Sequence, residues 1–146
     1  MLRYTIALTI LTSLQAVAQS YECKGGVGSA STLIGRDTKT LISIKPYSSE
    51  RKQIRVEIKG KSGYGCKFEF ISTDFKRTFR SDIYARKASG HYGYDARLEV
   101  YSSSEKIYFE FLTYPTSPDC DWHHYENKAR FDNCSLLKEK NNDVIL

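Results

Sequence analysis

The chain lacks the residue patterns that mark several common enzyme and metal-binding classes. None of its four cysteines is separated from the next by two to four residues, so the half-site of a structural zinc centre is missing. It contains no nucleophile elbow, HExxH pattern, P-loop or dinucleotide fingerprint. These absences argue against zinc-finger, α/β-hydrolase, zincin, P-loop and dinucleotide-binding assignments.

Long apolar runs are also scarce, and an extended one occurs only at the N-terminus. A short positive region, Met1 to Arg3, precedes a mostly apolar stretch, Tyr4 to Leu14, and Ala16-Val17-Ala18 then provides the small residues that a signal peptidase requires. The apolar stretch of about 11 residues is too short to span a bilayer. We therefore expect residues 1–18 to be a signal peptide. The first mature residue would be Gln19 and not a lipidated cysteine, so the product should be periplasmic or secreted, with no membrane span after cleavage.

The charge balance is mildly basic, and cysteines are few but even in number. There are 22 Lys and Arg against 17 Asp and Glu, a formal net charge of +5, which favours anionic partners without specifying them. Four cysteines in an exported chain indicate two disulfides. Of the three possible connectivities we favour Cys23 with Cys134 and Cys66 with Cys120, because this nested pattern ties the two chain ends together.

Alternation of apolar and polar residues predicts β-strands over most of the chain. Ile42 and Ile44 alternate with polar neighbours, and Ile54, Val56 and Ile58 form the clearest alternating run. Further strands are expected at 21–24, 66–71, 97–101, 106–114 and about 127–134, with 97–101 and 106–114 forming a hairpin. Residues 25–32 and 88–94 are expected to be loops, and 78–86 fit a short helix as well as a strand.

These segments predict an all-β fold. About seven or eight short strands with turn signals roughly every ten residues, and no long amphipathic helix, are typical of a small antiparallel β-barrel or a β-sandwich. We favour the barrel because closure removes exposed edges, and we keep the sandwich as the alternative. The expected organisation is a signal peptide at 1–18, a single β-domain at 19–137 and a flexible C-terminal tail at 138–146.

The densest cluster of reactive side chains lies at residues 118–126. In an extended conformation Asp119, Asp121 and His123 share one face and offer carboxylate and imidazole ligands to a divalent ion. Alternatively, Trp122 packs on the disulfide of Cys120, and the acids and histidines around it are solvated. Two nearby prolines favour a loop, which has no fixed face, and we expect no cofactor.

A second hypothesis is a small secreted hydrolase such as a ribonuclease. That chemistry needs two proton carriers and a cation that stabilises phosphate charge. His91, either His123 or His124, and Glu126 are the candidate carriers, and Arg86 or Lys87 is the candidate cation. The histidines do not have a spacing that this chemistry demands, so we rank the hypothesis below binding.

A binding role is suggested by the eleven tyrosines, because a tyrosine ring gives rigid contact area with a polar tip. β-Sheets also favour tyrosine for structural reasons. The tyrosines expected in turns or on outward faces are Tyr47, Tyr64, Tyr92, Tyr94, Tyr108, Tyr114 and Tyr125. The candidate binding residues are Ser89, Tyr92, Tyr94, Arg86 and Lys87. The expected partner is an anionic protein or glycan, and no nucleic acid is expected.

Three short segments carry a resemblance to a known family: Tyr21-Glu22-Cys23, Ser89-Gly90-His91-Tyr92 and Asn133-Cys134-Ser135-Leu136. They look like parts of the periplasmic and membrane-bound inhibitors of c-type lysozyme, which are small disulfide-closed β-barrels. By that resemblance, Ser89 would enter the lysozyme cleft, whereas the family's Trp-x-Lys-Gly stretch has no counterpart around residues 101–109. We assign no family. The sequence predicts an exported, non-catalytic binding protein, in its most concrete form an inhibitor of an envelope-directed hydrolase, with a wall-polymer-binding module as a further alternative.

Overall fold

The computed structural model describes residues 18–28, 35–60, 65–87, 95–102, 105–111 and 127–137. These residues form eleven β-strands and no helix, which confirms the all-β prediction. Accordingly, no helix that could cross a membrane was found in this part of the chain.

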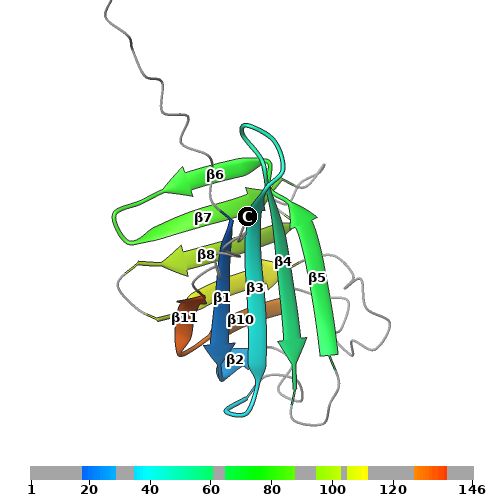
Figure 1. The fold of residues 1–146 in the computed structure, drawn as a ribbon, viewed down its shortest axis with the longest axis vertical. Helices are drawn as coiled ribbons and strands as arrows, with labels where there is room; N and C mark the ends of the chain where they lie inside the picture. The colour runs from blue at the N-terminus through cyan, green and yellow to red at the C-terminus, as the bar shows by residue number, and fades with distance from the viewer. Residues whose placement is uncertain are drawn as a thin grey trace, which may run out of the picture.

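The strands form two antiparallel sheets that face each other (Figure 1). The five-stranded sheet has the order β11-β1-β3-β4-β5 and contains β1 (Gln19–Lys24), β3 (Lys39–Pro46), β4 (Lys52–Lys59), β5 (Gly65–Ile71) and β11 (Cys134–Leu137). The six-stranded sheet has the order β2-β10-β9-β8-β7-β6 and contains β2 (Gly26–Gly28), β6 (Asp74–Arg77), β7 (Ser81–Arg86), β8 (Ala96–Tyr101), β9 (Ile107–Phe111) and β10 (Asn127–Phe131). In Figure 1 the strands of the two sheets cross at a steep angle.

The core lies between the sheets, where alternate side chains of both sheets meet. Phe68 of β5 is fully buried and meets two rings of β9 edge-on, Phe109 with a centroid distance of 5.2 Å and Phe111 at 4.8 Å. Buried residues from the five-stranded sheet surround these rings, among them the alternating isoleucines of β3 and β4. The predicted hairpin is confirmed as β8 and β9, with Leu98 opposite Phe109.

The chain passes from one sheet to the other four times, and three of these passages are corners that lie wholly within the described residues. Between β1 and β2 it bends at Gly25, which has a φ of +94°. Glycine adopts such a positive φ without steric strain because it has no Cβ. Between β10 and β11 it bends near Asn133, whose φ of 49° lies in the left-handed region that asparagine tolerates. Between β5 and β6 it bends at Ser72 and Thr73: Ser72 N donates to Lys52 O at 2.8 Å, and Thr73 N donates to Ala85 O at 2.9 Å.

These corners explain why the prediction of a closed barrel is wrong and why a two-sheet arrangement is observed instead. Each bent segment gives its first half to one sheet and its second half to the other, so the ladders end at the corners. Bending also divides long segments into short strands, which is why more strands are present than expected. Gly26–Gly28, expected to be part of a loop, forms β2, and the ambiguous segment 78–86 contains β7.

A disulfide joins β1 and β11, the first and last strands that the structure describes, next to one corner. Cys23 and Cys134 lie directly opposite each other on β1 and β11 and are bonded, which confirms this predicted pair. Both are buried, with 0% and 7% of their surface exposed. Cys66 is also disulfide-bonded, and its predicted partner Cys120 lies outside the described residues.

Candidate anion-binding site

Two of the site residues predicted from the sequence, Arg86 and Lys87, are described by the structure. The other candidates lie outside the described residues: Ser89, Tyr92 and Tyr94 for binding, His91, His123 and Glu126 for catalysis, and Asp119, Asp121 and His123 for a metal. Within the described ranges, no group of three or more His, Cys, Asp or Glu residues is placed to hold a metal ion.

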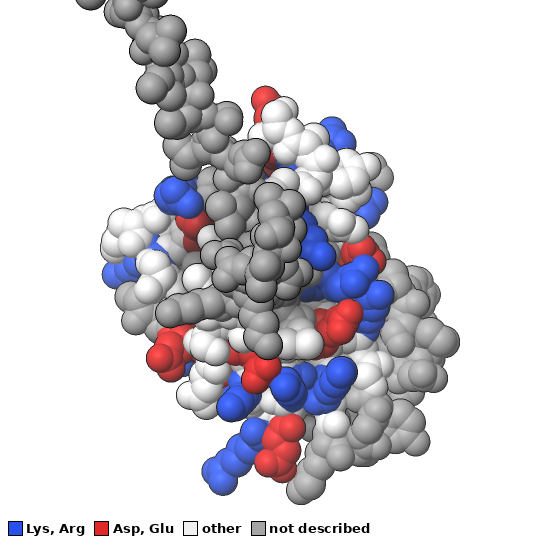
Figure 2. All heavy atoms as spheres, in the orientation of Figure 1, with Lys and Arg blue, Asp and Glu red and all other residues white. Residues whose placement is uncertain are grey.

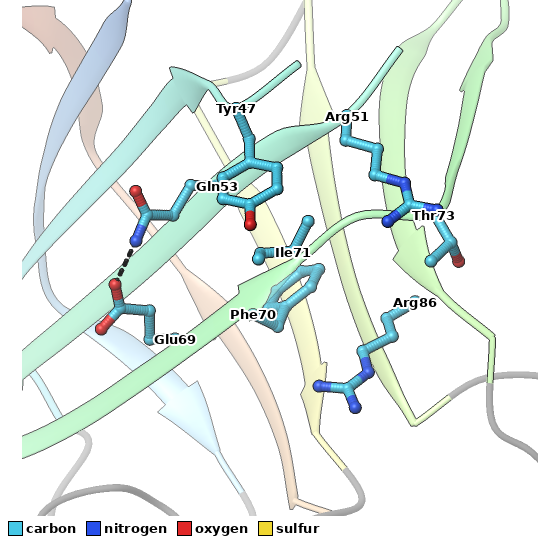
Figure 3. A pocket seen from close by; sticks show the side chains of 8 residues that line it. All are labelled: Tyr47, Arg51, Gln53, Glu69, Phe70, Ile71, Thr73 and Arg86. Atoms are coloured by element: carbon cyan, nitrogen blue, oxygen red, sulfur yellow. Dashed lines mark hydrogen bonds between the residues drawn. The ribbon is translucent and has the colours of Figure 1, made fainter.

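Arg86 lines a hollow of about 490 Å³ where the turn between β3 and β4 meets the bend between β5 and β6 (Figure 3). Its lining residues are Tyr47, Arg51, Gln53, Glu69, Phe70, Ile71, Thr73 and Arg86. We call it the Arg51–Arg86 hollow. Figure 3 shows Arg51, Thr73 and Arg86 on one wall, Gln53 and Glu69 on the other, and the Tyr47 ring between them.

The turn between β3 and β4 positions Tyr47 and Arg51 through its backbone. The amides of Tyr47 and Ser48 both donate to the carbonyl oxygen of Arg51, at 3.0 and 3.2 Å. Below the turn, the amide of Lys52 donates to the Oγ of the buried Ser72 at 3.0 Å, which ties β4 to the end of β5. The backbone of the hollow is therefore fixed on both sides, while the Tyr47 side chain stays in solvent, with the residue 57% exposed.

The carboxylate of the hollow, Glu69, is already bound by its neighbours. The side-chain amide of Gln53 donates a short hydrogen bond to Glu69 Oε1, and the guanidinium of Arg55 lies 3.6 Å from the same oxygen. These contacts hold the Glu69 carboxylate on its own wall, and Arg55 offsets part of its charge.

The opposite wall carries two guanidinium groups, of which Arg51 is the one without a carboxylate partner among the described residues. The Nε of Arg86 lies 3.4 Å from Oδ2 of Asp95, so one edge of this guanidinium is held in place. Within the part of the chain that the structure describes, no carboxylate pairs with Arg51. Between the two arginines, the Oγ1 of Thr73 accepts a hydrogen bond from the amide of Lys87 at 3.0 Å. Two guanidiniums, one fixed and one without a carboxylate, thus share a wall of the hollow.

Lys87 is not part of this wall, although the sequence predicted it together with Arg86. It does not line the hollow, and its Nζ lies 3.3 Å from Oδ2 of Asp74. The sequence prediction missed Arg51, Gln53 and Thr73. It did include Tyr47 among the tyrosines expected in turns. The sequence signal that could have revealed Arg51 is its position four residues after Tyr47 in the same turn.

The outer face of the five-stranded sheet is a poorer place for an anion. Figure 2 shows positive and negative side chains interspersed on this side of the molecule. Arg55 lies within 3.9 Å of Glu57 as well as near Glu69, and Lys39 lies 3.2 Å from Glu22. These cations are balanced locally, unlike Arg51.

A second hollow, of about 580 Å³, lies beside β6 and β7 and combines both charge signs with aromatic rings. Tyr84, one of its lining residues, has its pKa raised to about 12, first by burial and then by the carboxylate of Asp82. The same two causes raise the pKa of Tyr21. Both phenols remain protonated at neutral pH, so neither is poised for proton transfer there.

Comparisons with models of known protein families, with curated proteins and with solved structures found no match to this chain.

Proposed function

We propose that this chain is an exported, non-catalytic binding protein that recognises an acidic side chain or chain end of a partner protein in the Arg51–Arg86 hollow. The observation that carries the proposal is that Arg51, without a carboxylate among the described residues, and the anchored Arg86 both line this hollow. Guanidinium groups bind carboxylates through parallel hydrogen bonds, and such charge-assisted bonds are stronger than neutral ones.

The shape of the hollow suits a protruding group. A volume of about 490 Å³ admits one or two side chains of a partner, and Tyr47 stands beside them as an exposed ring with a polar tip. Tyrosine and arginine are the residue types that most often dominate binding energy at protein interfaces. This combination favours a protein partner over a simple inorganic anion.

The disulfide supports a location outside the cytoplasm, in the periplasm or the extracellular space. Disulfides persist in oxidising compartments and are rare in the cytosol, and the Cys23–Cys134 bond closes the domain. After removal of the signal peptide, which contains Arg3 and no acidic residue, the mature chain would carry a net charge of +4, and this charge would steer the protein toward acidic surfaces in that compartment.

In its most concrete form, the partner is an envelope-directed hydrolase that the protein inhibits. The support for this form is the short sequence resemblance around Ser89, which follows Arg86 closely in the chain. A bacterial cell-lysis assay with c-type lysozyme tests it. We expect lysis to slow in the presence of excess protein, and unchanged lysis would remove this form of the proposal.

Recognition of acidic groups is tested separately by calorimetric titration with a capped hexaglutamate peptide at low ionic strength. We expect the protein to bind hexaglutamate and not hexaglutamine. The double variant Arg51→Gln and Arg86→Gln should lose at least about tenfold in affinity, since each charge-assisted bond stabilises a complex by about 1.5–3 kcal/mol.

The matched control is the double variant Lys24→Gln and Lys59→Gln, which removes the same charge from exposed positions at the opposite end of the five-stranded sheet. Its affinity should stay within about twofold of the parent, because distant exposed charges are screened. Equal losses in the two double variants would mean that net charge alone drives binding, and the hollow would then not be the site.

A further inference from the structure

The hairpin of β6 and β7 exposes aromatic rings that the Arg51–Arg86 hollow does not use. Phe79, in the turn of the hairpin, is 88% exposed, and Phe75 of β6 is 47% exposed. In Figure 1 this hairpin projects beyond the edge of the five-stranded sheet. Burial of a phenylalanine ring is favourable, so a partner that covered this exposed ring would gain binding energy.

A guanidinium lies over each of the two rings. Arg80 is 4.9 Å from the ring centre of Phe79, and Arg77 is 5.7 Å from that of Phe75. Arg77 is neutralised, because it also forms a two-bond ion pair with Asp82 at 2.7 and 2.9 Å. Arg80 has no acidic partner among the residues that the structure describes.

The turn holds this tip in a defined conformation. The amide of Thr78 donates to the carbonyl oxygen of Ser81 at 2.9 Å, and the Oγ1 of Thr78 accepts from the amides of Arg80 and Ser81 at 3.2 and 3.0 Å. The Oγ of Ser81 in turn donates to the buried Glu99 at 2.7 Å. Phe79 is thus presented on a fixed turn anchored to the sheet.

We propose that this tip binds the surface of an anionic lipid bilayer, with the Phe79 ring in the interfacial region and Lys76 and Arg80 at lipid phosphates. Within the described ranges neither cation pairs with a carboxylate. Aromatic rings flanked by Lys and Arg are typical of peripheral membrane contacts, where the ring enters the interface and the cations meet anionic headgroups.

A bilayer fits the tip better than a protein pocket does. Phe79 is 88% exposed in the hairpin turn, so a protein partner would need a cavity of matching shape, whereas a fluid interface accepts a single exposed ring without one. One ring and two cations are fewer than a stable anchor needs, so the contact should be reversible. The proposal is independent of the Arg51–Arg86 hollow, which lies outside this hairpin turn.

Co-sedimentation with vesicles tests the proposal, using the complete exported domain. We expect binding to vesicles of phosphatidylglycerol mixed with phosphatidylcholine, weaker binding at high salt, and none to phosphatidylcholine alone. Phe79→Ala should lower the partition coefficient about tenfold. Lys76→Gln with Arg80→Gln should lower it by a similar factor.

The matched control is Leu136→Ala, which truncates another exposed apolar residue, 57% exposed, in the other sheet. All substituted positions are in solvent, and circular dichroism will verify that each variant folds. The proposal is overturned if anionic and neutral vesicles sediment the protein equally, or if Phe79→Ala binds no more weakly than Leu136→Ala. In the second case charge alone would explain the binding.

Discussion

Removing the disulfide between β1 and β11 should cost a large part of the stability of the domain. The double variant Cys23→Ala and Cys134→Ala eliminates a crosslink between residues 111 positions apart. In the unfolded chain this crosslink restricts a long loop. The loop-entropy relation assigns about 4.8 kcal/mol to a loop of this length at 25 °C.

The second disulfide changes this figure only slightly. Cys66 is bonded as well, and its predicted crosslink to Cys120 would shorten the effective loop in the unfolded chain. The entropy depends on the logarithm of loop length, so the expected loss falls only to about 4 kcal/mol. For a domain of this size, that corresponds to a melting temperature lower by roughly 15 °C.

Thermal unfolding followed by far-ultraviolet circular dichroism measures this loss. Ile42→Val is the control for a small loss of core volume, because Ile42 is buried on β3, the strand that pairs with β1, and the substitution should cost about 1 kcal/mol. A double-cysteine variant that melts no lower than Ile42→Val would refute the reasoning. The crosslink would then not restrict the unfolded chain.

Three further changes test the packing, the corners and the buried phenol. Thr40→Val should raise the free energy of unfolding by about 1 kcal/mol in urea titrations, because the fully buried Thr40 hydroxyl lacks a hydrogen-bond partner in the described structure. Thr38→Val should lower this free energy by a similar amount, because Thr38 Oγ1 accepts a hydrogen bond from the amide of Gly35 at 2.7 Å. Gly25→Ala should lower the urea midpoint, with a loss of about 1–2 kcal/mol, because a Cβ at φ +94° is strained and would lie 3.3 Å from a backbone oxygen. The pKa of Tyr84 is about 12 in the folded state and about 10 in the unfolded state, so its contribution to stability is complete below pH 10 and is lost as the pH rises to about 12. Between pH 9 and pH 11.5, the melting temperature of Tyr84→Phe should therefore fall by less than that of the parent.

Much of the strand arrangement could be predicted from local patterns. The strict alternation of Ile54, Val56 and Ile58 places these residues in the core on β4, as observed. The hairpin register, with Val100 opposite Ile107, likewise follows from facing apolar residues. Period-two patterns are reliable here because one face of each sheet is buried and the other is not.

The corners could not be predicted in the same way. Gly25 and Asn133 adopt positive φ angles where two segments distant in sequence pair with each other, and such pairing leaves no local signal. Gly26–Gly28 has a composition typical of loops but is a strand because it pairs with β10. A barrel and two sheets joined by bent segments share the same local alternation, so the pattern alone could not separate them.

The candidate site was partly visible in the sequence for a similar reason. Arg86 was predicted as a candidate cation and as a binding residue close in sequence to Tyr92 and Tyr94. Arg51 was not, because it lies far from Arg86 in sequence, and only the pairing of β4 with β5 and the bend into β6 bring the two residues to one hollow. Spacing rules find sites whose ligands are close in sequence, and this site is assembled across strands.

Nuclear magnetic resonance of the arginine side chains tests the central claim most directly. We predict that titration with capped hexaglutamate shifts the Nε–Hε signals of Arg51 and Arg86 together with the amide of Thr73, while the corresponding signal of Arg55, already paired with Glu57 and Glu69, stays in place. Shifts of equal size at arginines over the whole surface, or none at Arg51, would contradict an anion-binding site in this hollow.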